Sequence, residues 1–588
     1  MDLILSNKDI PENKKLFFID QRIFDSLNIK DKEKLNYKIG KSFDYSREQR
    51  LNSFNQCKEI FESILIDLSD QLNFIHNQSF SQTAWHIILG HWLYRMIFII
   101  YNRDKKLNEA INKNNFKNIH LLNTDEYNFA AFDSINAAWE SQNSEWNHAI
   151  FSELYRLSHK REINEIILPT LNKGVERQTF EDLFPEKFKN KCKLYLFKIF
   201  KFFKKNNDAL IYQSGLDFFS EKKLEICLKQ FPQVWPRLDI HYEKFDKKLR
   251  NKLNFNYENF EGLEKKIRYL IPKLIPNSAI ESFHNVMSTV SKMNFPQNPK
   301  FIFTSYAHTH DEVFKFFAAK KIDEGVSYFV GQHGGNYFTQ IDNDLLPEFN
   351  TCSKFFSWGR SLDNNQKNIV NFNYKVLNKS VKPNKKGNLL VVCRSLGHEQ
   401  LPYDRYIERK KNSQAIIDLT KMLSKEIISQ TKIRIHKSYK FKRNLLGEKL
   451  INFFKSKNLN IDYGKKSLHK EMSNSRLIYL SYDGTPLLEN LNFNFPTVCY
   501  WPNTFNHLNP KFDEIYQILI DAKILFLDQE DLVRHINRIW KNVDEWWESD
   551  FTQNKINEFT SHLSLIPPKK PIQHMSSILL KTVNNFDN

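Results

Sequence analysis

The chain has 588 residues, of which 41% are hydrophobic and 26% charged, and its formal net charge is +18 at pH 7. These proportions are those of a folded protein, and the length excludes a single compact domain because one hydrophobic core rarely serves more than about 250–300 residues. The positive charge runs through every segment, and the sequence holds no zinc knuckle, aromatic RNA-binding motif or basic recognition helix. We therefore expect no nucleic-acid partner and favour an anionic substrate or membrane surface.

The cysteines and the apolar segments indicate a cytoplasmic protein without a metal or cofactor. Six cysteines occur singly, with no CxxC pair, which argues against both a disulfide framework and a zinc site. Residues 1–20 contain only the short apolar runs LIL and LFFI, broken by charges and Pro11, and we do not expect a signal peptide. The longest apolar stretch, at 87–100, contains His91 and Arg95 and is too short to span a bilayer, so it predicts a buried helix.

The N-terminal third is predicted to be mostly helical. Within residues 48–77, apolar side chains recur at spacings near three and four, the pattern of a helix with one face in the core. These side chains are Phe54, Ile60, Ile64, Leu65 and Leu68. We expect this region to be a helical elaboration of the first domain.

From residue 209 onward, short apolar runs alternate with helical patterns, which predicts parallel sheets with crossover helices. Strand candidates of a first domain begin at residues 209, 300, 326 and 354, and those of a second domain at residues 389, 431, 460, 476, 496 and 522. The polar, Asn-rich and Lys-rich segment between the two sets predicts a linker. We therefore predict an α/β protein with two Rossmann-like, doubly wound domains, at 1–365 and 389–530, a linker at 366–388 and a helical tail at 531–588.

In open parallel sheets, ligands bind at the carboxyl ends of the strands, and the first turn of interest there is QHGG. A predicted strand ends just before Gln332, His333, Gly334 and Gly335. Glycines let backbone N–H groups approach an anionic ligand closely, and an imidazole accepts a proton near neutral pH. We expect His333 to be catalytic and its three neighbours in the turn to lie beside the substrate. The alternative is a tight turn whose histidine only hydrogen-bonds the backbone.

A second candidate turn follows the predicted strand that begins at residue 476 and comprises Ser481, Tyr482, Asp483, Gly484 and Thr485. Thr485 is a natural N-cap and Pro486 suits the first helical position, so a helix should begin here with free N–H groups that suit a phosphate. Glu489, one turn later, is placed to bind ribose hydroxyls. We expect Ser481, Gly484, Thr485 and Glu489 to bind the donor nucleotide, and Asp483 to lie near the substrate. The alternative is an ordinary capped helix with a solvated glutamate.

A third strand end, in KIRIHKSYKFKR at 432–443, carries His436 and Lys437, followed by Lys440, Lys442 and Arg443. Phosphate groups of a donor bind such cationic side chains, and we assign His436 to the donor phosphates. The alternative, for His436 as well as for the lysines and Arg443, is a solvated basic loop.

A fourth cluster, TSYAHTHDEVF at 304–314, holds His308, His310, Asp311 and Glu312 after a predicted strand. Two histidines and two acids can bind a metal, but one short run does not define a ligand geometry. We therefore favour helix-capping and supporting roles over a metal site, and we expect His308 to lie near the substrate.

The segment 186–207 combines an apolar helical side with lysines. The apolar side consists of Leu194, Phe197, Phe200 and Phe203, and the lysines are Lys189, Lys193, Lys201, Lys204 and Lys205. Such a helix suits an anionic membrane surface because lysine stems lie along the apolar face while their charges reach the headgroups. The alternative is a core helix with a solvated lysine face.

Five sequence blocks occur in the order found in a bacterial family of surface-carbohydrate transferases. The blocks are WHIILGHWLYRMIFIIYNRD at 85–104, GQHGG at 331–335, FSWG at 356–359, SYDGTPLLENL at 481–491, and the stretch at 495–526 that precedes VDEWWES at 543. The chain resembles that family over nearly its whole length, although His91 replaces a proline of the family pattern. The resemblance implies a GT-B fold, in which two Rossmann-like domains face a cleft.

More distantly, the late blocks are similar to those of CDP-glycerol glycerophosphotransferases and of capsular transferases of Kdo-type and sialic-type sugar acids. That similarity implies that a His-Gly turn of the first domain supplies a catalytic histidine, here His333. It also implies that a strand-end histidine and a Ser/Thr turn bind the nucleotide phosphates, here His436, Ser481 and Thr485. The proline that usually follows the second histidine is replaced by Lys437.

These features together predict transfer of a glycosyl group, such as a sugar acid, from a nucleotide-activated donor to a surface-polysaccharide or lipid-linked acceptor. The expected partners are a nucleotide sugar, a saccharide or lipid-linked acceptor, and the anionic inner face of the inner membrane. Two alternatives stay open. One is a CDP-alcohol phosphotransferase of the same fold, and the other is a non-catalytic binding subunit of an assembly complex.

Overall fold

The computed structural model describes most of the chain. It leaves out residues 9, 29–31, 42–45, 159–162, 171–186, 342–345, 361–367, 375–380, 395–404, 437–438, 440–444 and 585–588, and it describes only the backbone of residues 187–190, 445 and 584.

The described strands form three sheets, and every pairing between them is parallel. The first sheet has the order β3-β2-β1-β4-β5, with β1 Asp2–Ile4, β2 Lys15–Phe18, β3 Asn36–Ile39, β4 Asn118–Leu122 and β5 Asn164–Leu168. The middle sheet has the order β10-β9-β8-β7-β6, with β6 Leu210–Ile211, β7 Ile302–Thr304, β8 Tyr328–Gly331, β9 Lys354–Ser357 and β10 Ile369–Asn371. The C-terminal sheet has the order β13-β12-β11-β14-β15-β16, with β11 Asn388–Val392, β12 Thr431–Arg434, β13 Asn460–Asp462, β14 Ser475–Leu480, β15 Thr497–Tyr500 and β16 Leu525–Phe526.

The strand orders confirm the α/β class. In the first and the C-terminal sheets, the chain starts in the middle, moves to one edge and then crosses back, which is the doubly wound order of Rossmann folds. The middle sheet adds its strands in simple succession. Strands such as β11 and β14 are buried apolar runs, as expected where helices cover both faces of a parallel sheet.

The first sheet was not predicted, because the N-terminal third was expected to be mostly helical. The runs LIL and LFFI within residues 1–20 overlap the strands β1 and β2, whose apolar residues are buried. Three or four residues are too few to show a period, so they could not be told from other short apolar runs. The segment predicted as a linker, 366–388, also contains β10, which pairs with β9 at the edge of the middle sheet.

Helices cover the sheets. Around the first sheet they are α1 Gln21–Asp25, α3 Arg47–His76, α4 Gln82–Lys113, α5 Ser134–Glu140 and α6 Ser144–Ser158. The next are α8 Lys187–Phe200, α9 Phe218–Cys227, α10 Lys247–Arg250, α11 Gly262–Leu274, α12 Phe283–Lys292, α13 Ala307–His310, α14 Glu312–Asp323 and α15 Pro347–Thr351. The C-terminal set is α16 Arg405–Met422, α17 Lys425–Ser429, α18 Leu445–Ser456, α19 Leu468–Met472, α20 Thr485–Asn492, α21 Asp513–Asp521, α22 Gln529–Ile539, α23 Val543–Trp547, α24 Asp550–Leu563 and α25 Pro571–Asn584.

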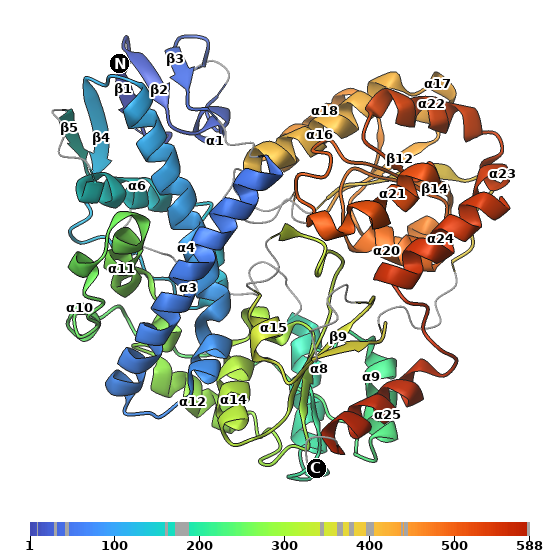
Figure 1. Cartoon of the computed structure of the whole chain (residues 1–588), viewed down its shortest axis with the longest axis horizontal. Helices are drawn as coiled ribbons and strands as arrows, with labels where there is room; N and C mark the ends of the chain where they lie inside the picture. The colour runs from blue at the N-terminus through green and yellow to red at the C-terminus, as the bar shows by residue number, and fades with distance from the viewer. Residues whose placement is uncertain are drawn as a thin grey trace.

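The predicted helices of the N-terminal third are present as the long pair α3 and α4, which run side by side (Figure 1). Ser46 caps α3 by accepting from the backbone N–H of Gln49, whose side chain accepts in return from Ser46, a reciprocal capping box. The apolar stretch at 87–100 is buried inside α4, as predicted. Among the described helices, none combines the length and apolar character that crossing a bilayer requires.

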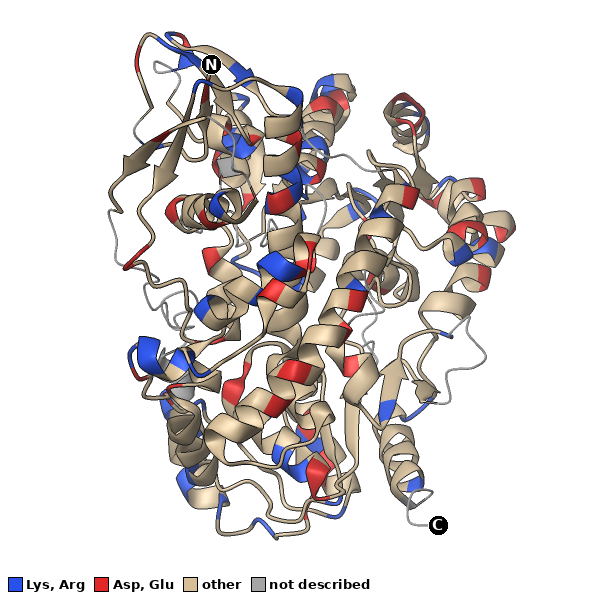
Figure 2. Ribbon diagram, turned by 60° about the vertical axis from the view of Figure 1, so that its left-hand side comes forward, with Lys and Arg blue, Asp and Glu red and all other residues tan. Residues whose placement is uncertain are grey.

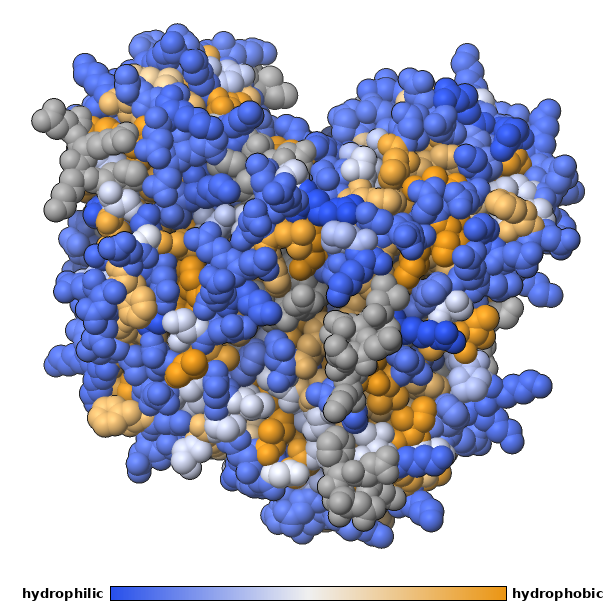
Figure 3. Space-filling model, viewed as in Figure 1, coloured by the Kyte–Doolittle hydropathy of each residue, from blue (hydrophilic) through white to orange (hydrophobic). Residues whose placement is uncertain are grey.

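The molecule has two upper lobes above a common base (Figure 1). The first sheet lies in the upper left lobe, the C-terminal sheet in the upper right lobe, and the middle sheet below them, and Figure 3 shows a notch between the two lobes. Basic and acidic residues are interspersed along the ribbon in Figure 2, as they are along the sequence. The predicted helical tail returns to the base, where α25 packs against α9 and the N–H of Leu565 donates to the carbonyl of Trp358 at 2.8 Å.

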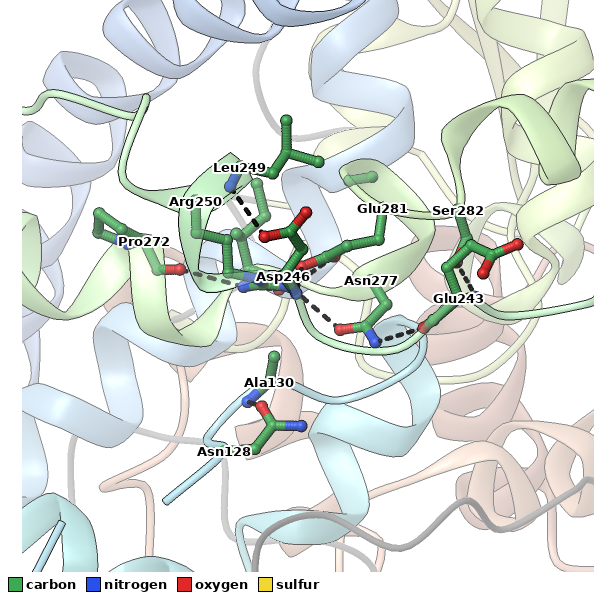
Figure 4. A network of polar contacts seen from close by, with 12 residues as sticks. Asn128, Ala130, Glu243, Asp246, Leu249, Arg250, Pro272, Asn277, Glu281 and Ser282 are labelled. Carbon is green, nitrogen blue, oxygen red and sulfur yellow. Dashed lines mark hydrogen bonds and ion pairs between the residues drawn. The ribbon is translucent and has the colours of Figure 1, made fainter. Parts of the chain in front are cut away.

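A buried arginine joins α10 to the loops beside α11 and α12 (Figure 4). The guanidinium of Arg250 donates to both carboxylate oxygens of Glu281, at 2.6 and 2.9 Å, and to Asn277 Oδ1 at 3.0 Å. Two further donations go to the carbonyls of Pro272 and Ile275. Because a bidentate pair with all its donors used is a specific contact, this network holds the helices between the first and middle sheets in one arrangement.

Candidate active site

The QHGG turn lies at the carboxyl end of the middle sheet, directly after β8. The side chain of Gln332 is buried and used inside the protein, since its Nε2 donates to the carbonyl of Gly334 at 2.8 Å and its Oε1 accepts from the N–H of Trp358 at 2.8 Å. Gln332 therefore shapes the turn and ties it to the end of β9. Its expected place beside the substrate stays a prediction.

His333 is half-buried and belongs to a chain of polar contacts. Its Nδ1 lies 2.6 Å from the hydroxyl of Tyr337, and that hydroxyl donates its single proton to Glu348 Oε1 at 2.8 Å. The tyrosine oxygen must then accept from an N–H at Nδ1 of His333. In the neutral imidazole this leaves Nε2 as the basic nitrogen.

Glu348 anchors this chain of contacts from below. Burial opposes ionisation of its carboxyl group, but the neighbouring His308 and His91 outweigh that effect and hold the pKa of Glu348 well below its usual range. Burial and the nearby Glu348 raise the pKa of Tyr337 well above its usual range. The tyrosine therefore stays protonated and the glutamate stays ionised, so the direction of both hydrogen bonds is set.

The two glycines of the turn face the second domain. The N–H of Gly335 donates to Thr485 Oγ1 at 2.8 Å. A Cβ atom on Gly335 would stand 2.7 Å from the backbone nitrogen of Thr485 and 2.8 Å from the carbonyl carbon of Gly484. Only glycine permits this approach, so the residue type at this position is explained by contact between the domains.

Thr485 begins the predicted helix, but it is not the cap. The helix α20 has Gly484 at its N-cap and Thr485 as its first helical residue. The physical reason is that the Thr485 hydroxyl accepts from Gly335 of the other domain instead of from its own helix. Glu489 is half-buried one turn further along α20, while Leu487, Leu488 and Leu491 are buried as predicted.

A crevice opens beside α20 at the carboxyl ends of β11, β14 and β15. The strand order reverses between β11 and β14, and such switch points are where doubly wound sheets bind ligands. The residues that line the crevice are Gln340, Arg394, Glu408, Asn412, Ser481, Tyr482, Asp483, Trp501, Pro502, Asn503, Thr504 and His507. Its volume of about 20 Å³ admits a single water molecule, so the crevice is closed in this conformation.

Several buried polar atoms of the crevice make no hydrogen bond with the described residues. They are Ser481 Oγ, Asn503 Oδ1 and His507 Nε2, of which His507 Nε2 lies 3.5 Å from the carboxylate of Asp483. Unsatisfied buried polar atoms are uncommon in folded proteins and cost about 1–3 kcal/mol each. Their gathering at the switch point favours a polar ligand there.

The crevice has a charged wall to which both domains contribute. The carboxylate of Glu408 in α16 lies 3.5 Å from Arg394 and 3.8 Å from Arg50 of α3. Burial opposes ionisation of Glu408, but the two arginines prevail and lower its pKa to about 2. Sequence analysis missed Arg394, although it follows β11 at the strand end where the rule for parallel sheets points.

Asp483 lines the crevice and helps to join the C-terminal sheet to the segment after the QHGG turn. Its expected place near the substrate stays a prediction. Asp483 accepts from the hydroxyl of Tyr516 at 3.2 Å, its carboxylate is 3.5 Å from His507, and its carbonyl accepts from Asn336 at 3.3 Å. Next to it, the N–H of Asn509 donates to the carbonyl of Thr339 at 2.7 Å. The segment that follows the QHGG turn is therefore docked on the C-terminal domain.

His436 follows β12, one strand further from the switch point, and is half-buried. It is at the expected edge of the sheet but is not among the described residues that line the crevice. Lys437, Lys440, Lys442 and Arg443 lie outside the described residues.

The cluster at 304–314 divides into different roles. Asp311 caps α14 by accepting from the N–H of Phe314 at 3.1 Å, and Glu312 pairs with Lys315 at 2.8 Å, which fits the helix-capping interpretation. His308 is buried beneath the QHGG turn, with its ring centroid 6.1 Å from that of His333. It therefore supports the turn from inside, and its expected place near the substrate stays a prediction.

A second cavity, of about 410 Å³, lies at the carboxyl ends of β1 and β2. Charged side chains line it, among them Lys8, Asp20, Arg22, Arg103 and Glu145. Its size is within the range of ligand sites. Sequence analysis missed this cavity because it missed the sheet that forms it.

The chain was compared with known proteins, and no curated protein matches it. Among solved structures, it is similar to MurG of Acinetobacter baumannii at 11% identity and a TM-score of 0.31, over 64% of this chain and 99% of that chain. It is also similar to MnaA of S. aureus, solved with UDP, at 8% identity and a TM-score of 0.33, over 80% of this chain and 97% of that chain. Likeness at this level gives no information on substrates or catalytic residues.

The model of one protein family, described as the LIC12162 family transferase, matches residues 5–579. That range contains the middle and C-terminal sheets, the first sheet except β1, the QHGG turn and α20. The chain therefore belongs to the LIC12162 family of transferases.

Proposed function

We propose that this transferase moves a glycosyl group from a nucleotide-activated donor to a surface-polysaccharide or lipid-linked acceptor, on a GT-B arrangement of domains. The observation that carries the proposal is the contact of the QHGG turn with the N-terminus of α20, where Gly335 N–H meets Thr485 Oγ1 at 2.8 Å. The contact joins a histidine at the strand ends of one parallel sheet to the switch point of another. A donor held by one domain and an acceptor held by the other meet at such a junction.

The donor nucleotide is assigned to the C-terminal domain. The first turn of α20 offers backbone N–H groups and the positive end of a helix dipole to a phosphate. Arg394 and the unsatisfied hydroxyl of Ser481 add a cation and a hydrogen-bond donor beside it. Because the crevice is closed and Thr485 is engaged by Gly335, the domains must separate for a nucleotide to enter and close again for transfer.

The proposed general base is Nε2 of His333. The Nδ1–H of the ring is held by Tyr337, which donates in turn to the ionised Glu348, so the ring keeps one tautomer and one orientation. When Nε2 takes the proton of an acceptor hydroxyl, the buried carboxylate stabilises the positive charge that forms on the ring.

Substitutions in α20 test the donor site. Thr485→Ala and Glu489→Ala should each weaken nucleotide binding by a factor of about 10 to 150, because losing one hydrogen bond to a charged group costs about 1.5–3 kcal/mol. Affinity is measured by titration calorimetry of wild type and variants. The matched control is Thr420→Ala in α16, whose hydroxyl donates to a carbonyl of its own helix and whose loss should not alter affinity. Unchanged affinity in both α20 variants would place the donor elsewhere.

The membrane contact is assigned to α8 and the turn that follows it. Of the apolar side chains expected there, Phe200 and Phe203 also pack on Phe231, with ring centroids 5.5 and 4.7 Å apart. The exposed apolar side chains of this segment are Tyr195, Ile199, Phe202 and Phe203, at 68, 43, 78 and 55% exposure. Exposed lysines flank them at 191, 193, 198 and 201, which suits an anionic surface.

Vesicle flotation tests this assignment. At low salt, the protein should float with anionic vesicles and stay behind with neutral ones, since both apolar insertion and lysine charge contribute to binding. The variant Tyr195→Ser/Phe202→Ser should lose flotation. Phe74→Ser, which removes an aromatic ring of 83% exposure from α3, is the matched control and should float as wild type does. Absence of wild-type flotation on anionic vesicles would remove the membrane claim.

A further inference from the structure

Three buried side chains from three helices meet beneath the QHGG turn. His91 comes from α4, His308 from α13 and Glu348 from α15, and their exposures are 2, 3 and 1%. His91 Nε2 lies 3.0 Å from Glu348 Oε2, and His308 Nε2 lies 3.4 Å from Glu348 Oε1. One ligand atom from each of the three residues falls within 4.8 Å of the others.

Several polar atoms of this cluster make no hydrogen bond within the described protein. They are both ring nitrogens of His91, both ring nitrogens of His308, and Glu348 Oε2. The two Nε2 atoms face the carboxylate of Glu348, as ion pairs if the rings are protonated. Buried polar atoms without a hydrogen bond are uncommon in folded proteins, so their gathering in one place favours a bound ligand.

We propose that His91, His308 and Glu348 bind a divalent first-row transition metal, with zinc as the best match. Two imidazoles and one carboxylate are a recurrent zinc ligand set, with metal–ligand bonds of about 2.0–2.2 Å, which places tetrahedral ligands about 3.3 Å apart. The separation of 3.0 Å between His91 Nε2 and Glu348 Oε2 fits that distance, and a ligand atom of His308 lies within 4.8 Å of one from each of the other two residues. Calcium and magnesium take oxygen ligands in preference to imidazole.

The cation would also explain how the catalytic turn is held. With Glu348 Oε2 on the metal, Oε1 remains for the hydroxyl of Tyr337, so the carboxylate is fixed at the atom that orients His333. His91, His308 and Glu348 are thus positioning residues for the turn. The site goes beyond the proposed glycosyl transfer, and its existence does not depend on that activity.

Metal analysis of the full chain tests the site directly. Protein purified without a metal-affinity tag from zinc-supplemented medium should carry about one equivalent of metal, and His91→Gln and Glu348→Gln should each lower the content at least about five-fold. The matched control is His86→Gln, which removes another buried histidine of the same helix, outside the cluster, whose Nε2 makes no hydrogen bond with the described residues. That variant should keep the metal.

A second measurement covers variants that fail to fold. Wild-type protein stripped by a chelator should melt at a lower temperature and recover when Zn²⁺ is returned, because a ligand that binds only the folded state stabilises it. The Glu348→Gln variant, if it folds, should show no rise in melting temperature when Zn²⁺ is added. The proposal is overturned if the wild-type protein holds no metal and its melting temperature does not change with Zn²⁺, Co²⁺, Mn²⁺ or Fe²⁺. It is also overturned if His86→Gln loses as much metal as His91→Gln and Glu348→Gln do.

Discussion

Replacing His333 by alanine should lower turnover by a factor of about 100 to 10,000, which is the usual contribution of a positioned general base. Nucleotide affinity should stay nearly unchanged, because the donor phosphates are assigned to the other domain. The expected loss follows from the contact chain through Tyr337 to Glu348, which leaves Nε2 as the basic atom of the ring. Steady-state kinetics at saturating donor, together with calorimetric titration of the nucleotide, separate the two effects.

Tyr337→Phe is the companion to this variant. It keeps the ring that packs beside His333, with centroids 5.2 Å apart, and removes only the hydroxyl that accepts from Nδ1. We expect a smaller loss of turnover than for His333→Ala, because the base remains but its tautomer is no longer fixed. If His333→Ala instead weakened nucleotide binding and left the rate at saturation normal, His333 would be a donor-site residue and the base would be another group.

Gly335→Ala should lower turnover at least about 100-fold, since a displacement near 1 Å between reacting groups has an effect of that size. The added Cβ would stand 2.7 Å from the backbone nitrogen of Thr485. The backbones at Gly335 and Thr485 cannot move apart unless the two domains move apart. The two domains therefore cannot reach the closed arrangement. Each should still fold, so the melting temperature and the nucleotide affinity should change little.

Gly334→Ala is the matched control for this prediction. Its Cβ would meet only the hydroxyl oxygen of Thr485, at 3.0 Å, and a side chain can rotate away. The loss should therefore be much smaller than for Gly335→Ala. Equal activity of Gly335→Ala and wild type would mean that catalysis does not require the closed contact between the turn and α20.

The sequence was most informative where strands are longer and apolar and turns carry glycine. The strands that end at QHGG and at Ser481 were predicted because VSYFVG and RLIYL are apolar runs followed by turn residues. The same rule predicted that both turns lie at strand ends. It could not show that the turns touch each other, because that contact depends on how two separately folded domains dock.

The missed parts have physical reasons. β1 and β2 are too short to show a period, so the first sheet and the cavity at its edge could not be foreseen. Glu408 and Arg50 are charged residues on helices, where sequence alone predicts solvent exposure. Their burial is explained by charge pairing, because Glu408 lies beside both Arg394 and Arg50. The N-cap of α20 is Gly484 and not Thr485, because the Thr485 hydroxyl accepts a hydrogen bond from Gly335, 150 positions away in the chain.

The most direct test of the central claim, that a nucleotide-activated donor binds at the switch point of the C-terminal sheet, is a thermal-shift screen of CMP, UDP, GDP, dTDP and CDP. We predict that one nucleotide stabilises the wild-type chain, by about 2.7 kcal/mol when its concentration is 100 times Kd. The same nucleotide should stabilise Thr485→Ala less at equal concentration. A screen in which no nucleotide raises the melting temperature of the wild-type chain would contradict the account.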